Sequence, residues 1–232
     1  MSIPLLNSGE VHIWFCSYKL SEKTKIQLYN LLTIEEERKA SNFIFEKDQE
    51  TTKVSRGLLR YLLSSYLNID SSKIMFYEGK YGKPDYKIIE HNNKPKIHFN
   101  LSHSAGLIMI GFSLDYDIGV DLELYRKDYD FYPIVNEFFT MNEISYFITG
   151  ENDEKSHRFF YLWTRKEAYM KNIGDGLNIP LNSFHVLNDK IANKDNKQYY
   201  IKSIPLRLDN YCAAFCLTGM PIVERYMTFI NM

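Results

Sequence analysis

Two carboxylates lie on one face of a predicted strand over residues 118–124. Apolar side chains alternate there with Gly119, Asp121 and Glu123, so a strand places the two acids on the same face. At roughly 3.3–3.4 Å per residue, their Cα atoms are about 6.6–7 Å apart. Two like charges this close disfavour each other's ionisation unless a cation lies between them. The pattern predicts either a cation site or the solvated outer face of an amphipathic strand.

A second set of charges lies on the helix predicted over residues 154–173. At about 100° per residue, Lys166 and Glu167 fall inside the arc of the helix that its large apolar side chains mark as buried. Those side chains are Phe159, Phe160, Leu162, Trp163, Met170 and Ile173. Lys171 lies at the edge of the arc, one turn after Glu167. Buried charges are rare unless they are paired or bound to metal. The pattern therefore indicates a carboxylate and an ammonium at a water-accessible cleft, or else side chains that snorkel to the surface or form a salt bridge with each other.

Three carboxylates on two rigid elements make a candidate site for a hard cation. Mg²⁺ takes oxygen ligands and commonly binds through a few carboxylates together with substrate phosphates. Lysines beside such a site would contact the same phosphates as point charges. Asp121, Glu123, Glu167 and Lys171 therefore predict phosphate chemistry, provided that the helix and the strand meet.

Three ordered segments resemble the signatures of the 4′-phosphopantetheinyl transferases. They are Phe99–Ser104 (FNLSHS), Ile118–Glu123 (IGVDLE) and Trp163–Lys171 (WTRKEAYMK). The Trp-x-x-Lys-Glu-Ala pattern is the most specific, followed by Gly-x-Asp-x-Glu, and their order, separation and the following Gly174-x-Gly176-Leu177 also match. The length resembles the larger, monomeric Sfp-type class, and the resemblance covers roughly residues 10–190.

The resemblance implies a metal site and a general base. Asp121, Glu123 and Glu167 resemble the three ligands of Mg²⁺, with Mn²⁺ as the alternative ion. Glu167 also resembles the base toward an acceptor serine, acting directly or through water. Lys171 resembles the lysine that contacts the transferring phosphate.

The resemblance also implies a coenzyme A site. His103 and Ser102 resemble residues near the phosphates of coenzyme A, and Lys83, in the turn Tyr-Gly-Lys-Pro, resembles a lysine near the adenine. Residues further upstream resemble a pocket for the 3′-phosphate; they are Arg38 and Lys39, with Thr52 and Arg56 as weaker candidates. One departure is Glu36, which stands where the family often has a second pocket lysine.

Each of these residues also has a structural interpretation. His103 could satisfy backbone groups in a serine-rich turn, and Lys83 could be an ordinary exposed turn lysine. Arg38 and Lys39 follow three glutamates and could form a solvated helix face with ion pairs three or four residues apart.

The implied reaction transfers 4′-phosphopantetheine from coenzyme A to a serine of an apo carrier protein and releases adenosine 3′,5′-bisphosphate. It requires neutralised phosphate charge, in-line positioning and a base. An acyl or peptidyl carrier must also dock, and we expect part of residues 125–147, rich in Tyr and Phe, to contact it. Core packing is the alternative for that segment. Fatty-acid, polyketide and nonribosomal-peptide carriers all stay open.

Two other functions remain compatible with the residues. A metal-dependent phosphohydrolase or nuclease could use two strand carboxylates and a helix Glu-Lys pair. A non-catalytic homologue that binds coenzyme A or a carrier is the other alternative. The intact set of Asp121, Glu123, Glu167 and Lys171 favours an enzyme.

Composition limits the partners and the location. The 232 residues include 28 Lys plus Arg and 29 Asp plus Glu, for a net charge of -1, which argues against wholesale nucleic-acid binding. Three cysteines and no signal-peptide pattern favour reduced thiols. No apolar run approaches the roughly 20 residues of a membrane span. We expect a cytoplasmic monomer that binds neither nucleic acid nor membrane.

The elements that must position these residues predict an α+β fold. Strands, a long helix and short strands occur twice, which predicts a pseudo-twofold arrangement of two similar halves, residues 1–105 and 106–232. Each half is expected to have a small, mostly antiparallel sheet and a long packed helix, with coenzyme A between the halves. The predicted helices cover residues 21–32, 48–67, 133–139, 141–148 and 154–173. The predicted strands cover residues 11–18, 74–77, 97–101, 107–114, 118–124, 184–187, 198–204, 211–217 and 222–229, with 107–114 and 118–124 paired as a hairpin.

Overall fold

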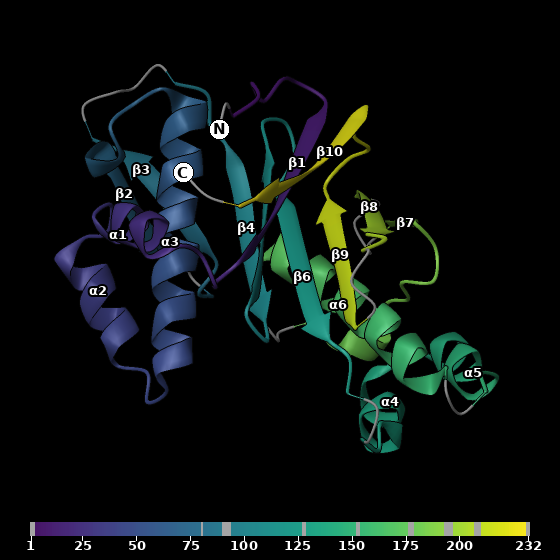
Figure 1. The fold of residues 1–232 in the computed structure, drawn as a ribbon. Helices are drawn as coiled ribbons and strands as arrows, with labels where there is room; N and C mark the ends of the chain where they lie inside the picture. Colours follow the sequence, from purple (N-terminus) through teal and green to yellow (C-terminus); the bar gives the residue numbers. More distant parts are fainter. Residues whose placement is uncertain are drawn as a thin grey trace.

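Two four-stranded sheets and two long helices organise the described part of the chain (Figure 1). The computed structural model describes residues 3–79, 81–89, 94–126, 129–151, 154–175, 179–192, 197–206 and 210–230. The strand orders are β10-β1-β5-β4 in the first sheet and β6-β9-β8-β7 in the second. The α+β class and the pseudo-twofold arrangement predicted from the sequence are confirmed.

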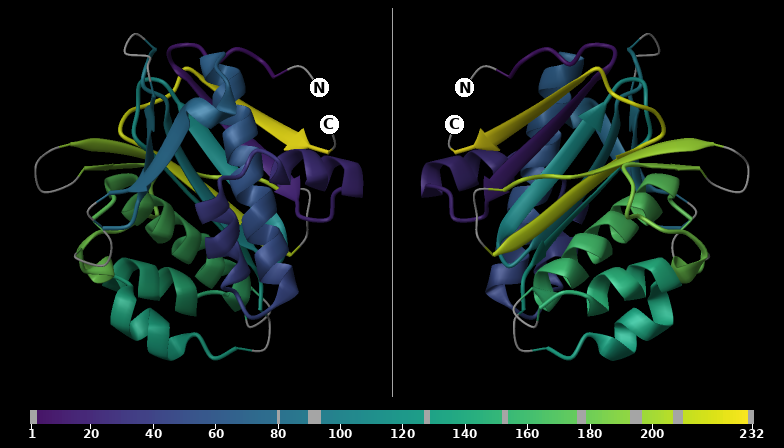
Figure 2. Two further views of the ribbon diagram at one scale, coloured as in Figure 1. Left: turned by 90° about the vertical axis from the view of Figure 1, so that its left-hand side faces the viewer. Right: turned by 90° about the vertical axis from the view of Figure 1, so that its right-hand side faces the viewer.

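The first sheet joins the two ends of the described chain. Its strands are β1 (Glu10–Ser17), β4 (His98–Ser104), β5 (Leu107–Ser113) and β10 (Val223–Phe229). β1 pairs in parallel with β10 and antiparallel with β5, which pairs antiparallel with β4. Both views of Figure 2 show β10, in yellow, beside β1, in purple. The first sheet thus extends past the expected boundary after residue 105, because it contains β5 and takes its edge strand from the far end of the sequence.

A long helix covers the outer face of the first sheet. The helices of this half are α1 (Glu22–Tyr29), α2 (Ile34–Ser41) and α3 (Glu46–Leu67), followed by a single 3₁₀ turn, η1 (Ser71–Lys73). The apolar stripe of α3, including Leu58 and Leu62, packs on Trp14, Ile110 and Phe112 of the sheet. A separate hairpin of β2 (Ile74–Glu78) and β3 (Pro84–Ile88) follows η1.

The second sheet is antiparallel throughout and is covered by α6 (Lys155–Ile173). Its strands are β6 (Ile118–Leu124), β7 (Lys190–Ala192), β8 (Gln198–Ser203) and β9 (Tyr211–Leu217). Two shorter helices, α4 (Tyr132–Phe138) and α5 (Met141–Ile148), belong to this half, as does the 3₁₀ turn η3 (Leu181–Ser183). Phe131, Phe147, Phe159 and Phe160 form part of the core of this half. Many of the aromatic side chains therefore serve packing.

Side chains join the two sheets. β4 does not form a backbone ladder with β6; instead the side chains of Asn100, Ser102 and Ser104 accept hydrogen bonds from successive alternate backbone N–H groups of β6. The acceptor–donor distances are 2.9 Å to Val120, 3.3 Å to Leu122 and 3.2 Å to Leu124. A second apolar cluster, including Ile13, Met109 and Val120, lies between the sheets. The strand that carries two predicted site carboxylates is therefore fixed to both halves.

Two strand predictions are wrong, and both errors concern backbone partners. The predicted hairpin of residues 107–114 and 118–124 does not form, because β5 pairs with β1 and β4 while β6 pairs with β9. Residues 184–187 are not a strand, because buried charged side chains satisfy their backbone instead. Arg165 donates to the carbonyl of Val186, and Glu143 accepts from its N–H. The helix α2 and the strands β3 and β7 were not predicted.

No described helix is long and apolar enough to cross a bilayer.

Candidate active site

The β6 carboxylates lie where the two sheets meet. Alternation along β6 puts Ile118, Val120 and Leu122 into the apolar cluster between the sheets. Asp121 and Glu123 point the other way, toward α6 and β4. Asp121 is 2% exposed, and Glu123 is half-buried and accepts a hydrogen bond from the Ser104 hydroxyl at 3.0 Å.

Helix α6 brings Lys171 to the same place. Its Nζ lies 2.6 Å from Asp121 Oδ1 and 3.1 Å from the hydroxyl oxygen of Ser102. Glu167, one turn earlier, is half-buried and lines the same cavity as Lys171. The helix and the strand therefore meet, as the predicted phosphate site requires, and Ser102 lies among these residues.

Carboxylate crowding dominates the electrostatics of the site. Burial raises the pKa of Glu123, and the neighbouring Asp121 charge raises it further. Burial also raises the pKa of Glu167, followed by the charges of Asp121 and Glu123, while Lys171 acts against them. One ammonium thus offsets only part of the repulsion among three acids.

The donor set fits a divalent cation in its chemistry. Asp121 Oδ2 is buried and has no hydrogen-bond partner, which is costly for a carboxylate oxygen unless something else compensates it. Carboxylates such as those of Asp121, Glu123 and Glu167 are the ligand type that Mg²⁺ takes. Among the described residues, however, no three acidic, histidine or cysteine side chains converge closely enough to form a ready-made metal centre.

The β4 residues of the candidate site behave differently from each other. Ser102 is buried and touches Asp121 and Lys171, whereas His103 points to the other face of β4 and is exposed overall. The pKa of His103 is lowered, first by desolvation of the ring and then by the Lys171 charge. This lowering favours a neutral imidazole that lies within electrostatic range of the cleft.

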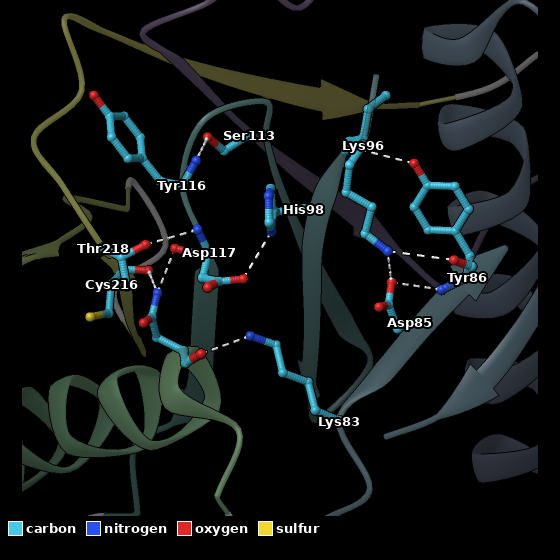
Figure 3. A network of polar contacts seen from close by, with 12 residues as sticks. Lys83, Asp85, Tyr86, Lys96, His98, Ser113, Tyr116, Asp117, Cys216 and Thr218 are labelled. Carbon is cyan, nitrogen blue, oxygen red and sulfur yellow. Dashed lines mark hydrogen bonds and ion pairs between the residues drawn. The ribbon is translucent and has the colours of Figure 1, made fainter. Parts of the chain in front are cut away.

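A cavity of about 300 Å³ opens beside these groups. Among the described residues, ten from both halves line it: Tyr81, Gly82, Lys83, Pro84, Asn100, Leu101, Glu167, Met170, Lys171 and Gly174. Lys83 reaches across from the β2–β3 turn, and its Nζ donates to the backbone carbonyl of Asn172 at 2.8 Å (Figure 3). The predicted site residues Lys83, Glu167 and Lys171 are therefore brought together at one cleft, here called the seam cleft.

Two of the upstream candidates, Lys39 and Arg56, lie elsewhere, around a larger cavity of about 570 Å³ in the first half. Lys39, Arg56 and Glu36 line this first-half cavity, and Pro84 lines both cavities. Arg38 is exposed and Thr52 is half-buried, and neither is among the described residues that line either cavity.

Ion pairs neutralise the first-half cavity from within. Glu36 Oε2 accepts from Arg60 Nε at 2.8 Å, and Glu36 Oε1 lies 3.7 Å from Arg56 Nε. The guanidinium groups of Arg56 and Arg60 each lie 5.0 Å from the ring centre of Phe76. Lys39 pairs loosely with Glu78 at 3.6 Å. Glu36 therefore engages the cations that a phosphate would otherwise meet.

Lys166 does not belong to the cleft, contrary to the alternative that placed it there. It is fully buried, and its Nζ lies 2.9 Å from a carboxylate oxygen of Glu143. The same Nζ donates to the carbonyls of Leu181 and Phe184 at 2.7 and 2.8 Å. The salt-bridge interpretation holds for Lys166, with Glu143 rather than Glu167 as its partner.

Sequence reasoning missed two groups that shape the site. Asn100 and Ser104 were not predicted; they share one face of β4 with the predicted Ser102, and this polar alternation in an otherwise apolar strand was a signal that could have revealed the seam. Asn172, beside Lys171, is 2% exposed and binds the ends of β6 and β9. Asn172 gave no signal, because it lies outside the arc that the large apolar side chains of the helix mark as buried. The structure shows that the opposite face of the helix, which carries Arg165, Ala168 and Asn172, is also buried, against the second sheet.

Comparisons with known proteins identify the class. A family model described as the 4′-phosphopantetheinyl transferase superfamily matches residues 117–216, and a model described as 4′-phosphopantetheinyl transferase, N-terminal, matches residues 18–113.

Three similar relatives carry the same description. The 4′-phosphopantetheinyl transferase ffp of Bacillus subtilis is 32% identical over 167 residues, covering 72% of this chain and 71% of the relative. HetI of Nostoc is 32% identical, covering 74% and 72%. Sfp of Bacillus subtilis strain 168 is 30% identical, covering 72% and 71%. The chain belongs to the 4′-phosphopantetheinyl transferases of Sfp type and is an enzyme of that class. The family resemblance seen in the sequence motifs is confirmed.

Proposed function

We propose that this enzyme transfers 4′-phosphopantetheine from coenzyme A to a serine hydroxyl of an apo acyl or peptidyl carrier protein, with Mg²⁺ as its metal. The observation that carries the proposal is the junction of β6 and α6 in a member of this family. There Asp121, with its unpartnered Oδ2, pairs with Lys171 beside Glu167. We also infer a cytoplasmic location from the three free cysteines, and a monomer from a chain length that resembles the larger, monomeric Sfp-type class.

The residues of the seam cleft divide the work. Lys171 supplies a point charge for the transferring phosphate, and Ser102 holds the Lys171 ammonium in place. Glu167 accepts the proton of the serine hydroxyl, directly or through a water molecule. A bond forms between the serine oxygen and the β-phosphorus of the coenzyme A pyrophosphate. The bond from that phosphorus to the bridging oxygen of the pyrophosphate breaks. Adenosine 3′,5′-bisphosphate leaves with the bridging oxygen.

The acidic triad is the proposed metal site. Asp121, Glu123 and Glu167 would hold Mg²⁺, or Mn²⁺ in its place. When bound, the ion supplies positive charge to the pyrophosphate and offsets the carboxylate repulsion. The raised pKa values of Glu123 and Glu167 fit a site that contains more negative charge than its own lysine balances.

The two cavities suggest how coenzyme A lies. Its pyrophosphate would occupy the seam cleft near Lys171 and His103, with Lys83 toward the adenine. The adenosine end would lie near Pro84, which lines both cavities. The 3′-phosphate would then lie near Lys39 and Arg56 and would have to displace them from their carboxylate partners Glu78 and Glu36. Arg38 and Thr52 stay candidates farther out, since neither is among the described residues that line a cavity.

The carrier-docking proposal narrows to the exposed side chains of residues 125–147. Phe131 and Phe139 are 5% and 3% exposed and belong to the core, so they do not offer a docking surface. Tyr129, Tyr132 and Met141 are 53%, 41% and 76% exposed. We expect these three to meet the carrier, and alanine at Tyr132 and Met141 together should raise the KM for the carrier without changing the KM for coenzyme A.

A mass measurement tests the reaction directly. The protein is incubated with coenzyme A, MgCl₂ and a panel of apo acyl and peptidyl carrier proteins. Transfer adds roughly 340 Da, the mass of the phosphopantetheine group from its chemical composition, to the carrier. Chelation with EDTA should stop the gain, and Mg²⁺ or Mn²⁺ should restore it. No mass gain on any carrier, together with hydrolysis of nucleotides or DNA, would replace the proposal with a phosphohydrolase.

A further inference from the structure

The C-terminal end of α6 is fixed by a polar network drawn from several elements of both halves (Figure 3). Asn172 Nδ2 donates to the backbone carbonyl of Asp117 at 2.5 Å and to that of Cys216 at 3.0 Å. These two carbonyls lie where β6 begins and β9 ends. Thr218 N also donates to the Asp117 carbonyl at 3.1 Å, so the backbone itself already joins β6 and β9 at this end. The two Asn172 hydrogen bonds are therefore not needed for the pairing of these strands.

The backbones of α6 and β6 touch at one glycine. A Cβ atom at Gly119 would lie 2.1 Å from the Ala168 carbonyl oxygen and 2.3 Å from the Asn172 nitrogen. Only glycine permits such an approach. The contact falls between Asp117, which binds Asn172, and Asp121, which binds Lys171.

The first half also holds the end of α6. Lys83 Nζ donates to the Asn172 carbonyl, one of the last carbonyls of the helix, where a cation is favoured. The stem of Lys83 passes Gly174, where a Cβ would lie 3.0 Å from Lys83 Cδ. His98 of β4 binds the Asp117 carboxylate at 2.8 Å. The position of α6 is therefore tied to β4 and to the β2–β3 turn as well as to its own sheet.

We propose that Asn172 is a positioning residue, whose two hydrogen bonds fix how α6 lies over β6 and so hold Glu167 and Lys171 at their working distances from Asp121. The inference rests on the proposed function for its catalytic consequence. Asn172 follows Lys171 directly and lies five residues after Glu167, so a slide or rotation of the helix end moves both. A misplacement of about 1 Å at a reacting centre can cost on the order of 100-fold in rate.

Asn172→Leu tests the proposal, because leucine keeps the volume and removes both donors. We expect kcat to fall about 10- to 100-fold while the KM values for coenzyme A and for the carrier stay within about twofold. The matched control is Tyr66→Phe. The Tyr66 hydroxyl accepts from Trp14 Nε1 at 2.7 Å and contacts His12 Nδ1 at 2.8 Å, in a buried network of the first half. Tyr66→Phe should lower the Tm and leave kcat unchanged.

A double-mutant cycle separates positioning from general damage. If Asn172 acts through Lys171, then Asn172→Leu combined with Lys171→Met should lose less than the product of the two single losses in kcat. Losses that multiply would overturn the proposal, as would a kcat for Asn172→Leu within twofold of the wild type.

Amide hydrogen exchange gives a readout that needs no turnover. Asn172→Leu should speed exchange in the last two turns of α6, and Tyr66→Phe should not. Unchanged exchange in those turns would refute the fixing role of Asn172, whatever the activity. If the wild-type protein modifies no carrier but exchange rises as expected, the proposed function fails while the structural part of the inference stands.

Discussion

Two lysines on α6, five residues apart, lie in opposite kinds of environment. The ammonium of Lys166 has three oxygen partners within 2.9 Å, and its carboxylate partner Glu143 is fully buried and fully bonded. Glu143 also accepts from Thr140 N at 2.9 Å and from Val186 N at 2.8 Å. Lys171 instead is partly exposed at a cavity and serves one carboxylate of a crowded group.

The difference teaches how to separate a structural charge from a functional one. Around Lys166 every charge has a partner, so the pair specifies how α5, α6 and residues 181–186 pack. Around Lys171 a buried oxygen of Asp121 lacks a partner, and two neighbouring carboxyl groups have raised pKa values. Unsatisfied charge of this kind marks a site prepared for a ligand.

The largest effect is expected at the crowded site. Glu167→Gln removes the proposed base but keeps the shape, so we expect the transfer rate to fall about 10²- to 10⁴-fold. Carrier mass gain over time measures it, with circular dichroism to confirm folding. Glu22→Gln, an exposed change on α1, is the control. A rate within tenfold of the wild type would remove Glu167 from the role of base.

A change in the Lys166–Glu143 pair should lower the stability of the protein, because this pair lies in the core and not at the cleft. Lys166→Met leaves the buried Glu143 without its ammonium, and breaking such a pair costs about 3–5 kcal/mol of unfolding free energy. Urea unfolding measures the loss. Adding Glu143→Gln to Lys166→Met should restore part of it, because the uncompensated charge is then gone. If Lys166→Met were as stable as the wild type but inactive, Lys166 would have a functional role like that of Lys171, and the contrast between the two lysines would be wrong.

The two lysines also show which features of the site could be predicted from the sequence. Asp121, Glu123, Glu167 and Lys171 could be found because the period of a strand and the motif spacing are local. The partner of Lys166 could not, since Glu143 is distant along the chain and helical spacing cannot show which helix packs against another. Strand pairing failed for the same reason: nothing local tells β5 to pair with β1 and β4, or β10 to return to β1.

Removing a charge from the crowded site should raise the stability of the protein, whereas removing the Lys166 charge should lower it. The pKa of Glu123 is raised in the folded protein, so at neutral pH its charge costs folding free energy. Glu123→Gln should therefore raise the Tm of the metal-free protein by about 1–3 °C while reducing transfer. Differential scanning calorimetry with EDTA measures this, with Glu46→Gln, an exposed change on α3, as the control. A lower Tm for Glu123→Gln would mean that the site is not crowded in solution.

The smallest effect concerns Glu10, a carboxylate that is paired like Glu143 but lies at the start of β1 in the first sheet. Its pKa is lowered to about 2, first by the hydrogen bond from Arg225 of β10, which lies 2.9 Å away. A lowered pKa means that the stabilisation is complete above the unfolded value near 4.5 and is lost as the pH falls from there toward 2. Arg225→Gln should therefore be less stable than the wild type at pH 7, and the gap should narrow below pH 4.5. Urea midpoints at pH 7, 5, 4 and 3.5 test it, with Lys23→Gln on the exposed side of α1 as the control. A gap that stays constant with pH would show that Arg225 holds β10 by packing and not through the Glu10 charge.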